Sequence, residues 1–106
     1  MNRANNLEDI KRSLEENRVV LLYFGAENCS VCEVLRPKIE DSLKENFPKI
    51  KSLFIENLID INVEFGVFSN PTIILMIDKK EFKRYGRNIS LNIFSSEIKR
   101  LYDMVY

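Results

Sequence analysis

"VVLLYFGAENCSVCEVLRP", residues 19–37, joins a buried strand to a long helix through the only two cysteines of the chain, and it decides the fold. The run "VVLLYF" (19–24) is continuous, apolar and rich in β-formers, which is typical of a strand buried on both faces. After Gly25 the apolar residues recur at helical spacing, and this stripe predicts one long helix: Cys32, Leu35, Ile39, Leu43 and Phe47. Because the stripe continues past Pro37, we expect a kink within that helix rather than its end.

The remaining segments complete an alternating α/β order. Their patterns predict a helix at about residues 6–17, a strand at 52–57, a short helix or connector at 59–65, a strand at 72–77, a half-exposed strand at 81–86 and a helix at 91–105 that Ser90 caps. Strand–helix–strand units imply parallel pairing, and the late hairpin adds an antiparallel strand at one edge. We therefore expect a single domain over residues 1–106, an α/β sandwich with one mixed sheet covered by helices on both faces.

Composition narrows the possible functions. Sixteen basic residues balance sixteen acidic ones, so no charge excess points to a nucleic acid or an anionic membrane. The longest apolar run, residues 19–24, is too short to span a bilayer, and the charged N-terminal stretch lacks the apolar core of a signal peptide. The absence of histidine excludes Ser–His and Cys–His catalytic pairs. We expect a cytoplasmic monomer with no nucleic-acid or membrane partner, whose distinctive chemistry is that of cysteine.

The two cysteines stand three positions apart at the start of the predicted helix, and the pattern makes them unequal. Their helical Cα separation of about 5 Å lies within the window of roughly 4.4–6.8 Å that a disulfide needs. Cys32 belongs to the apolar stripe and should be buried. Cys29 falls at the helix entry, where unpaired backbone N–H groups and the helix dipole favour a thiolate. An exposed Cys29 with a sheltered Cys32 behind it suits disulfide exchange, in which one thiol attacks and the other resolves.

Two other interpretations of the pair stay open from the residues alone. Zinc prefers four ligands, and two cysteines without histidine supply half a site, so we expect no metal unless the protein dimerises across it. The second alternative is an inert pair of core residues, because free cysteine often simply packs. A lone Cys-x-x-Cys is only moderately specific, but its place after a buried strand and at a helix start favours a redox pair.

Over about residues 18–106 the chain resembles the thioredoxin-like family. The resemblance rests on "YFGAENCSVC" (23–32) after the buried strand, Pro37 in the following helix, "FSNPT" (68–72) before the third strand, and Gly86 after the hairpin. It implies a mixed sheet of four or five strands flanked by helices, with Cys-x-x-Cys at the N-terminus of the second helix. The segment before this region is short for the family, so we expect a four-stranded sheet with the first family strand missing or reduced.

The resemblance also implies an activity and its partners. It implies a protein disulfide oxidoreductase in which Cys29 and Cys32 are the catalytic residues and no cofactor is bound. The implied partners are protein disulfides and a reductant, either a thioredoxin-reductase-type flavoenzyme or a low-molecular-weight thiol.

A substrate site follows from the same resemblance. In the family the proline that matches Pro71 is cis and faces the cysteine pair. The residue before it, here Asn70, offers backbone groups to an extended substrate segment, which is a form of strand addition. We expect Asn70 and Pro71 to dock the substrate together with Ser30 and Val31, the dipeptide between the cysteines.

The chain departs from thioredoxin itself in and around the motif. Asn28 stands where thioredoxin has tryptophan, and Ser30-Val31 replaces Gly-Pro, a dipeptide that tunes thiol pKa and reduction potential. Tyr23 aligns with the buried aspartate of thioredoxin; because tyrosine has a pKa of about 10, we expect it to be a core residue. Glu27 and Glu33 flank the motif, where their charges oppose thiolate formation. These departures leave a second hypothesis open, a thioredoxin-fold module that binds a peptide or protein with little redox turnover.

Overall fold

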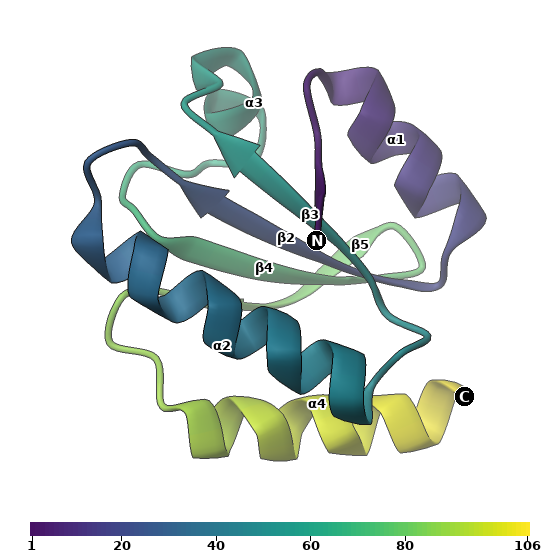
Figure 1. The fold of residues 1–106 in the computed structure, drawn as a ribbon. Helices are drawn as coiled ribbons and strands as arrows, with labels where there is room; N and C mark the ends of the chain where they lie inside the picture. The colour runs from purple at the N-terminus through teal and green to yellow at the C-terminus, as the bar shows by residue number, and fades with distance from the viewer.

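The computed structural model describes residues 1–106 as a five-stranded mixed sheet between two layers of helices (Figure 1). In chain order the elements are β1 (Asn2–Arg3), α1 (Leu7–Glu16), β2 (Val19–Gly25), α2 (Ser30–Asn46), β3 (Lys51–Glu56), α3 (Ile59–Glu64), β4 (Thr72–Ile77), β5 (Lys80–Tyr85) and α4 (Leu91–Val105). The strands lie in the order β1-β3-β2-β4-β5. Every segment predicted from the sequence is present, with bounds that agree to within one residue.

β2 is the centre of the sheet. It pairs in parallel with β3 and antiparallel with β4, so both of its edges are covered. All of its residues are buried, and alternate side chains enter different hydrophobic clusters. Val19, Leu21 and Tyr23 belong to the cluster on one face of the sheet. The residues between and after them belong to the cluster on the other face: Val20, Leu22 and Phe24. The continuous apolar run is therefore that of a strand with a core on each side.

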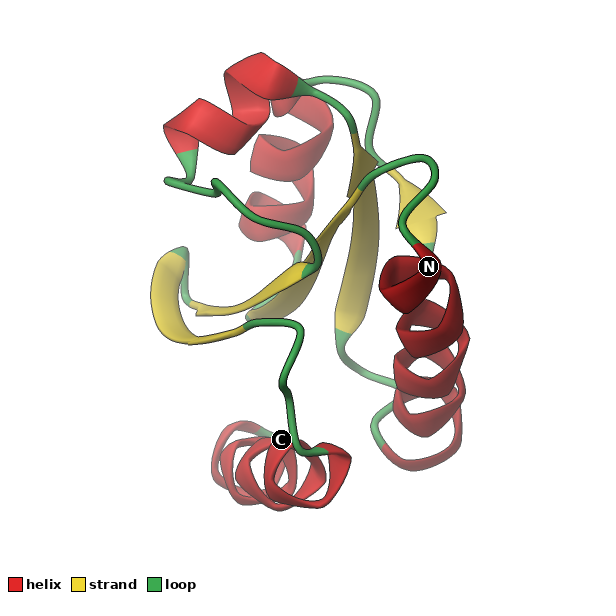
Figure 2. Cartoon of the chain, turned by 90° about the vertical axis from the view of Figure 1, so that its left-hand side faces the viewer, coloured by secondary structure: helices red, strands yellow, loops and turns green.

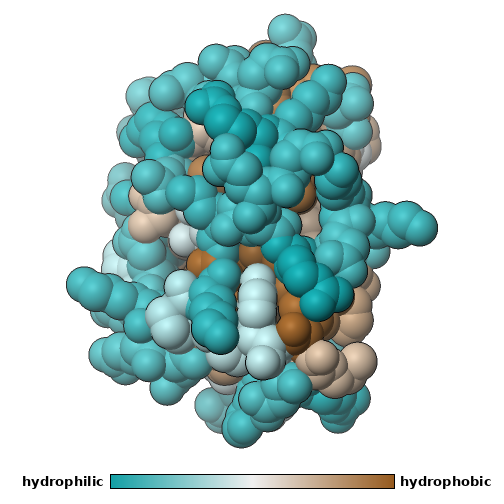
Figure 3. Space-filling model, turned by 90° about the vertical axis from the view of Figure 1, so that its right-hand side faces the viewer, coloured by the Kyte–Doolittle hydropathy of each residue, from teal (hydrophilic) through white to brown (hydrophobic).

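Two layers of helices cover the two faces of the sheet. α2 and α4 contribute Ile39, Phe94 and Ile98 to the first cluster. α1 and α3 contribute Ile10 and Ile61 to the second. Figure 2, seen from the end where β2 connects to α2, shows the sheet between these layers. The opposite end presents a mostly hydrophilic surface (Figure 3).

None of the helices combines the length and the hydrophobicity needed to cross a bilayer.

The sheet has five strands rather than the expected four, and the first family strand is present in the reduced form that the sequence allowed. β1 has only two residues, and it pairs in parallel with Leu53 and Phe54 of β3. The Ala4 backbone N–H extends this pairing by donating to the Phe54 carbonyl at 2.9 Å. Both β1 residues are exposed, so the segment has no alternation of apolar and polar residues from which a strand could be predicted.

β5 is more exposed than the half-exposed strand that we predicted. Five of its six residues are exposed, and only Tyr85 is half-buried. A shift of register opposite Leu75 and Met76 leaves Phe82 without a partner in β4, and the Phe82 side chain is 52% exposed. Because such a bulge inserts one extra residue, it breaks the alternation on which the prediction relied.

Candidate active site

The two cysteines lie where β2 gives way to α2. Cys29 is the N-cap residue of α2, and Cys32 lies in the first turn of that helix. Their Cα atoms are 5.2 Å apart, and a disulfide joins the two side chains. The pairing of the cysteines with each other, which the spacing allows, is therefore observed.

The two sulfur atoms have different surroundings. Cys32 is 5% exposed and packs in the cluster beneath α2, whereas Cys29 is partly exposed at the open end of the helix. The Cys29 Sγ accepts a hydrogen bond from the Cys32 backbone N–H at 3.3 Å. This N–H group and the positive end of the helix dipole therefore lie where they favour negative charge on the Cys29 sulfur. The predicted difference in burial between the two cysteines is confirmed.

Gly25, the last residue of β2, allows close packing beneath the disulfide. A Cβ atom at this position would lie 3.1 Å from the Phe54 ring, 3.5 Å from the Tyr23 ring and 3.6 Å from the Cys32 Cβ. The first distance is shorter than ordinary van der Waals contact, so a larger residue would force the ring or the helix to move. The sequence did not reveal this role, because a single glycine after a strand also fits an ordinary turn.

The second part of the site is the loop between α3 and β4, residues 66–71, which we call the cis-proline loop. The Asn70–Pro71 peptide bond is cis, in agreement with the resemblance. Thr72, which follows it, pairs with Phe24 at the end of β2, so the loop and the cysteines lie at the same end of the sheet (Figure 1). The Thr72 hydroxyl donates to the Ser69 carbonyl at 2.7 Å and closes the loop on itself.

The residues predicted to bind substrate stand on these two segments. Ser30 is exposed and Val31 is half-buried in the first turn of α2. In the cis-proline loop Pro71 is buried, and Asn70 is half-buried with an Oδ1 atom that has no hydrogen-bond partner. Phe68 is 85% exposed and supplies apolar surface at this end of the molecule.

Comparison with known proteins agrees with this geometry. The family model described as Thioredoxin matches residues 2–100. The chain belongs to the thioredoxin family. A thioredoxin-like protein of Bacillus subtilis, YdfQ, is 27% identical over 104 residues, which cover 96% of this chain and 92% of that protein. A thioredoxin of Rickettsia felis is 40% identical over 77 residues, which cover 68% of this chain and 73% of that protein.

Solved thioredoxin structures share the fold. A mutant thioredoxin from Halobacterium salinarum superimposes with a TM-score of 0.84 at 21% identity, covering 93% of this chain and 88% of that one. Thioredoxin 1 from Thermosipho africanus superimposes with a TM-score of 0.72 at 31% identity, covering 80% of this chain and 96% of that one. Membership of the thioredoxin family and the linked Cys29–Cys32 pair together support thiol–disulfide oxidoreductase activity.

Two departures from thioredoxin have structural explanations. Asn28 has a φ of 59°, in the left-handed region that asparagine tolerates better than most residues. Tyr23 is fully buried, and its hydroxyl donates to the Cys32 carbonyl at 3.0 Å. Burial raises the pKa of Tyr23 to about 12, although the charge of Arg36 opposes this rise. The full burial of Tyr23 confirms the expectation that it is a core residue, and its hydroxyl keeps its proton at neutral pH.

A polar hollow of about 310 Å³ opens beside Cys32. Two guanidinium groups lie near the Phe54 ring that lines it, Arg36 at 4.1 Å and Arg3 at 4.9 Å from the ring centroid. Three carboxylates also line the hollow: Glu27, Glu33 and Glu56. The sequence reasoning missed this feature, because Arg3 and Phe54 reach it from β1 and β3. Glu27 and Glu33 flank the motif in the sequence, and Arg36, one helical turn after Cys32, could also have been placed beside the cysteines from its spacing.

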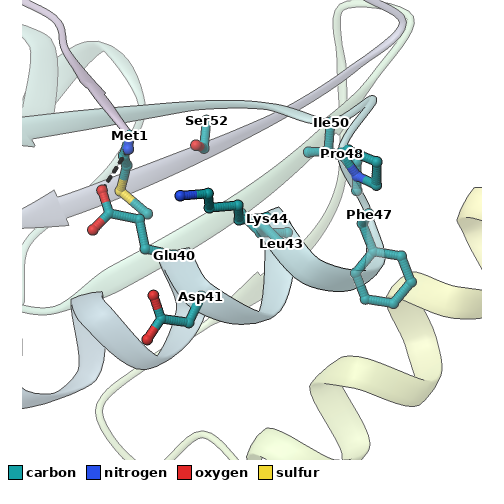
Figure 4. A pocket seen from close by; sticks show the side chains of 9 residues that line it. All are labelled: Met1, Glu40, Asp41, Leu43, Lys44, Phe47, Pro48, Ile50 and Ser52. Atoms are coloured by element: carbon teal, nitrogen blue, oxygen red, sulfur yellow. Dashed lines mark hydrogen bonds and ion pairs between the residues drawn. The ribbon is translucent and has the colours of Figure 1, made fainter.

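A second hollow, of about 370 Å³, lies at the other end of α2 and apart from the cysteines (Figure 4). The Met1 ammonium group and the Glu40 carboxylate form an ion pair at its edge. The remaining lining residues come from the end of α2, the connection to β3 and β3 itself: Asp41, Leu43, Lys44, Phe47, Pro48, Ile50 and Ser52. In neither hollow are three or more histidine, cysteine, aspartate or glutamate side chains grouped so that they could hold a metal ion.

Proposed function

We propose that the protein, acting as a single thioredoxin-like domain, reduces or exchanges disulfides of protein substrates through Cys29 and Cys32. The observation that carries the proposal is the difference in solvent exposure between the two cysteines. Cys29 is partly exposed at the N-terminus of a long helix, whereas Cys32 is buried behind it. That difference assigns the attacking role to Cys29 and the resolving role to Cys32.

The first step is attack by the Cys29 thiolate on one sulfur of a substrate disulfide. A bond forms between that sulfur and the Cys29 Sγ, and the second substrate sulfur leaves as a thiolate that takes a proton from solvent. An extended substrate segment lies along Asn70 and Pro71 during this step, with Ser30 and Val31 on the other side. The Cys32 backbone N–H, which donates to the Cys29 Sγ, stabilises the attacking thiolate.

The second step releases the substrate. Cys32 loses its proton, its thiolate attacks the Cys29 Sγ, and the substrate sulfur leaves as a second thiol. The substrate has then gained two electrons, and the protein holds the Cys29–Cys32 disulfide. Because burial raises the pKa of Tyr23, its hydroxyl does not act as the base that accepts the proton of Cys32. We propose that solvent water accepts this proton through the polar hollow beside Cys32.

The cycle needs no bound cofactor, because an external reductant returns two electrons to the disulfide. A thioredoxin-reductase-type flavoenzyme or a low-molecular-weight thiol fits this role. We propose a cytoplasmic setting, where disulfides are mostly transient and catalytic. We also propose that the protein works as a monomer, since all of the proposed site residues belong to one chain.

The proposal is tested by measuring reduction of the insulin disulfides, with dithiothreitol as electron donor, by the protein and by its Cys29→Ser and Cys32→Ser variants. Cys29→Ser should be inactive. Cys32→Ser should accumulate a mixed disulfide with insulin that mass spectrometry detects on Cys29. If the protein and both variants reduce insulin equally slowly, the proposed activity is wrong and a binding module is the better description.

A redox titration of the Cys29–Cys32 pair would refine the proposal. Potentials of thioredoxin-like pairs range from about −270 mV for reductases to about −120 mV for strong oxidants. The measured value would therefore assign the protein to reduction, isomerisation or oxidation of its substrates.

A further inference from the structure

The edge strand β5 carries an arginine whose contacts reach the cis-proline loop. The Arg84 guanidinium donates to the Phe65 carbonyl at 2.7 Å and to the Gly66 carbonyl at 2.8 Å. It also donates to both carboxylate oxygens of Glu81, at 2.7 Å and 3.0 Å. One side chain therefore binds a carboxylate on its own strand and two backbone carbonyl groups some eighteen residues earlier in the chain.

The bulge in β5 places Glu81 and Arg84 on the same face of the sheet. In a regular strand two residues three positions apart point to opposite faces. Here Phe82 is the extra residue of the bulge, so Glu81 stands opposite Met76 and Arg84 stands opposite Ile74. Met76 and Ile74 both belong to the cluster on the α1/α3 face. The bulge thus directs both charged side chains to the face on which α3 packs.

The two carbonyl groups that Arg84 binds belong to the end of α3. Gly66 has a φ of 64°, and its N–H donates to the Val63 carbonyl at 3.1 Å. The Val67 N–H donates to the Asn62 carbonyl at 2.7 Å. This pair of bonds is the Schellman motif that ends many helices. The Phe65 and Gly66 carbonyl groups take no part in this motif and accept hydrogen bonds from Arg84. A side chain of β5 therefore fixes the direction in which the chain leaves α3.

We propose that Arg84, held by Glu81, is a positioning residue that fixes the start of the cis-proline loop and so presents Asn70 and Pro71 to the substrate. Gly66 and Pro71 are the two ends of this loop, and the Thr72 hydroxyl holds its second half through Ser69. The expected effect of Arg84 on substrate reduction rests on the proposed function. The clamp itself, the Arg84 guanidinium on the two carbonyl groups, is independent of that function.

The test compares Arg84→Met with a matched control. Arg12 also pairs with an acidic residue three positions away, Asp9 at 2.8 Å, but it lies on α1 and binds no carbonyl group of the loop. Arg84→Met should raise the KM for insulin reduction between about threefold and tenfold with little change in kcat, because substrate docking is weakened while the cysteines are untouched. Arg12→Met should leave both constants unchanged.

Two further measurements separate positioning from general loss of structure. The reduced Arg84→Met variant should react with cystamine, a small disulfide without a peptide segment, at the rate of the unmodified protein. Arg84→Lys keeps the positive charge but cannot make the paired hydrogen bonds of a guanidinium group. Its KM for insulin should therefore lie between that of Arg84→Met and that of the unmodified protein. An insulin KM for Arg84→Met equal to that of Arg12→Met would overturn the proposal, and so would an equal loss of rate towards insulin and cystamine.

Amide hydrogen exchange tests the clamp without reference to activity. In Arg84→Met the amides of residues 67–70 and of Thr72 should exchange faster, while those of α2 should keep their protection. Unchanged exchange in the loop would overturn the proposal even if the protein reduces disulfides. If the unmodified protein reduces neither insulin nor cystamine, the proposed function is wrong, and loop exchange alone decides whether Arg84 positions the loop.

Discussion

The segment that carries the cysteines, residues 25–32, and the cis-proline loop are held in place in different ways. The cysteine segment is fixed by its own backbone and by the core beneath it: Gly25 packs against Phe54, and Cys29 caps α2. The cis-proline loop is fixed by side chains from other elements, chiefly Arg84 of β5. The two halves of one site therefore differ in what holds them, close packing against the core for the cysteine segment and side-chain hydrogen bonds for the cis-proline loop.

The largest effect is expected from a substitution that disrupts the packing of the cysteine segment. Gly25→Val should lower the free energy of unfolding by about 1–3 kcal/mol, because the new side chain crowds the Phe54 ring. Denaturant unfolding measures the change. Gly86→Val is the control, since nothing lies within 4 Å of a Cβ at that position, and it should change stability by no more than about 0.5 kcal/mol. Equal losses in the two variants would show that Gly25 is not tightly packed.

A smaller effect is expected from loosening the cis-proline loop. Thr72→Val removes the hydrogen bond to the Ser69 carbonyl and should lower the free energy of unfolding by about 1 kcal/mol. Amide exchange in residues 67–70 and at position 72 should rise, whereas alkylation of reduced Cys29 should keep its rate. Thr72→Ser keeps the hydroxyl and should retain the loop protection. A change in Cys29 reactivity in Thr72→Val would contradict the independence of the two segments.

The smallest effect is a pH dependence of the Arg84 clamp. The hydrogen bond from Arg84, aided by its charge, lowers the pKa of Glu81 from its ordinary value of 4.5, although burial opposes this shift. Because the folded pKa is the lower one, the Glu81 carboxylate stabilises the fold fully above the ordinary value. That contribution is lost as the pH falls through the folded pKa. Side-chain NMR titration should show that the pKa of Glu81 is higher in Arg84→Met than in the unmodified protein. An unchanged pKa would mean that the paired hydrogen bonds between Arg84 and Glu81 do not form in solution.

The same contrast explains what could be predicted from the sequence. The burial of β2, the entry into α2 and the inequality of Cys29 and Cys32 follow from patterns within twenty residues. Asn70 and Pro71 could be named only through the family resemblance, because nothing in their neighbourhood indicates a cis bond. The hollow beside Cys32 was not predicted, since Phe54 enters it from another strand.

The edge strands show a second physical limit of sequence patterns. β1 pairs through two exposed residues, which show no alternation of apolar and polar side chains. In β5 the bulge at Phe82 shifts the alternation, so the face on which Glu81 and Arg84 meet cannot be deduced from their spacing. Strand pairing of this kind depends on backbone hydrogen bonds rather than on side-chain character, and sequence patterns record only the latter.

The central claim is that Cys29 is the activated thiol and Cys32 the sheltered one. It is tested most directly by alkylating the reduced protein with iodoacetamide across a range of pH and assigning the modified cysteine by mass spectrometry. The account predicts that Cys29 reacts first, with a pKa below the ordinary value of about 8.5, and that Cys32 reacts slowly. A Cys29 pKa at or above that value, or faster modification of Cys32, would contradict the account and favour a thioredoxin-fold binding module.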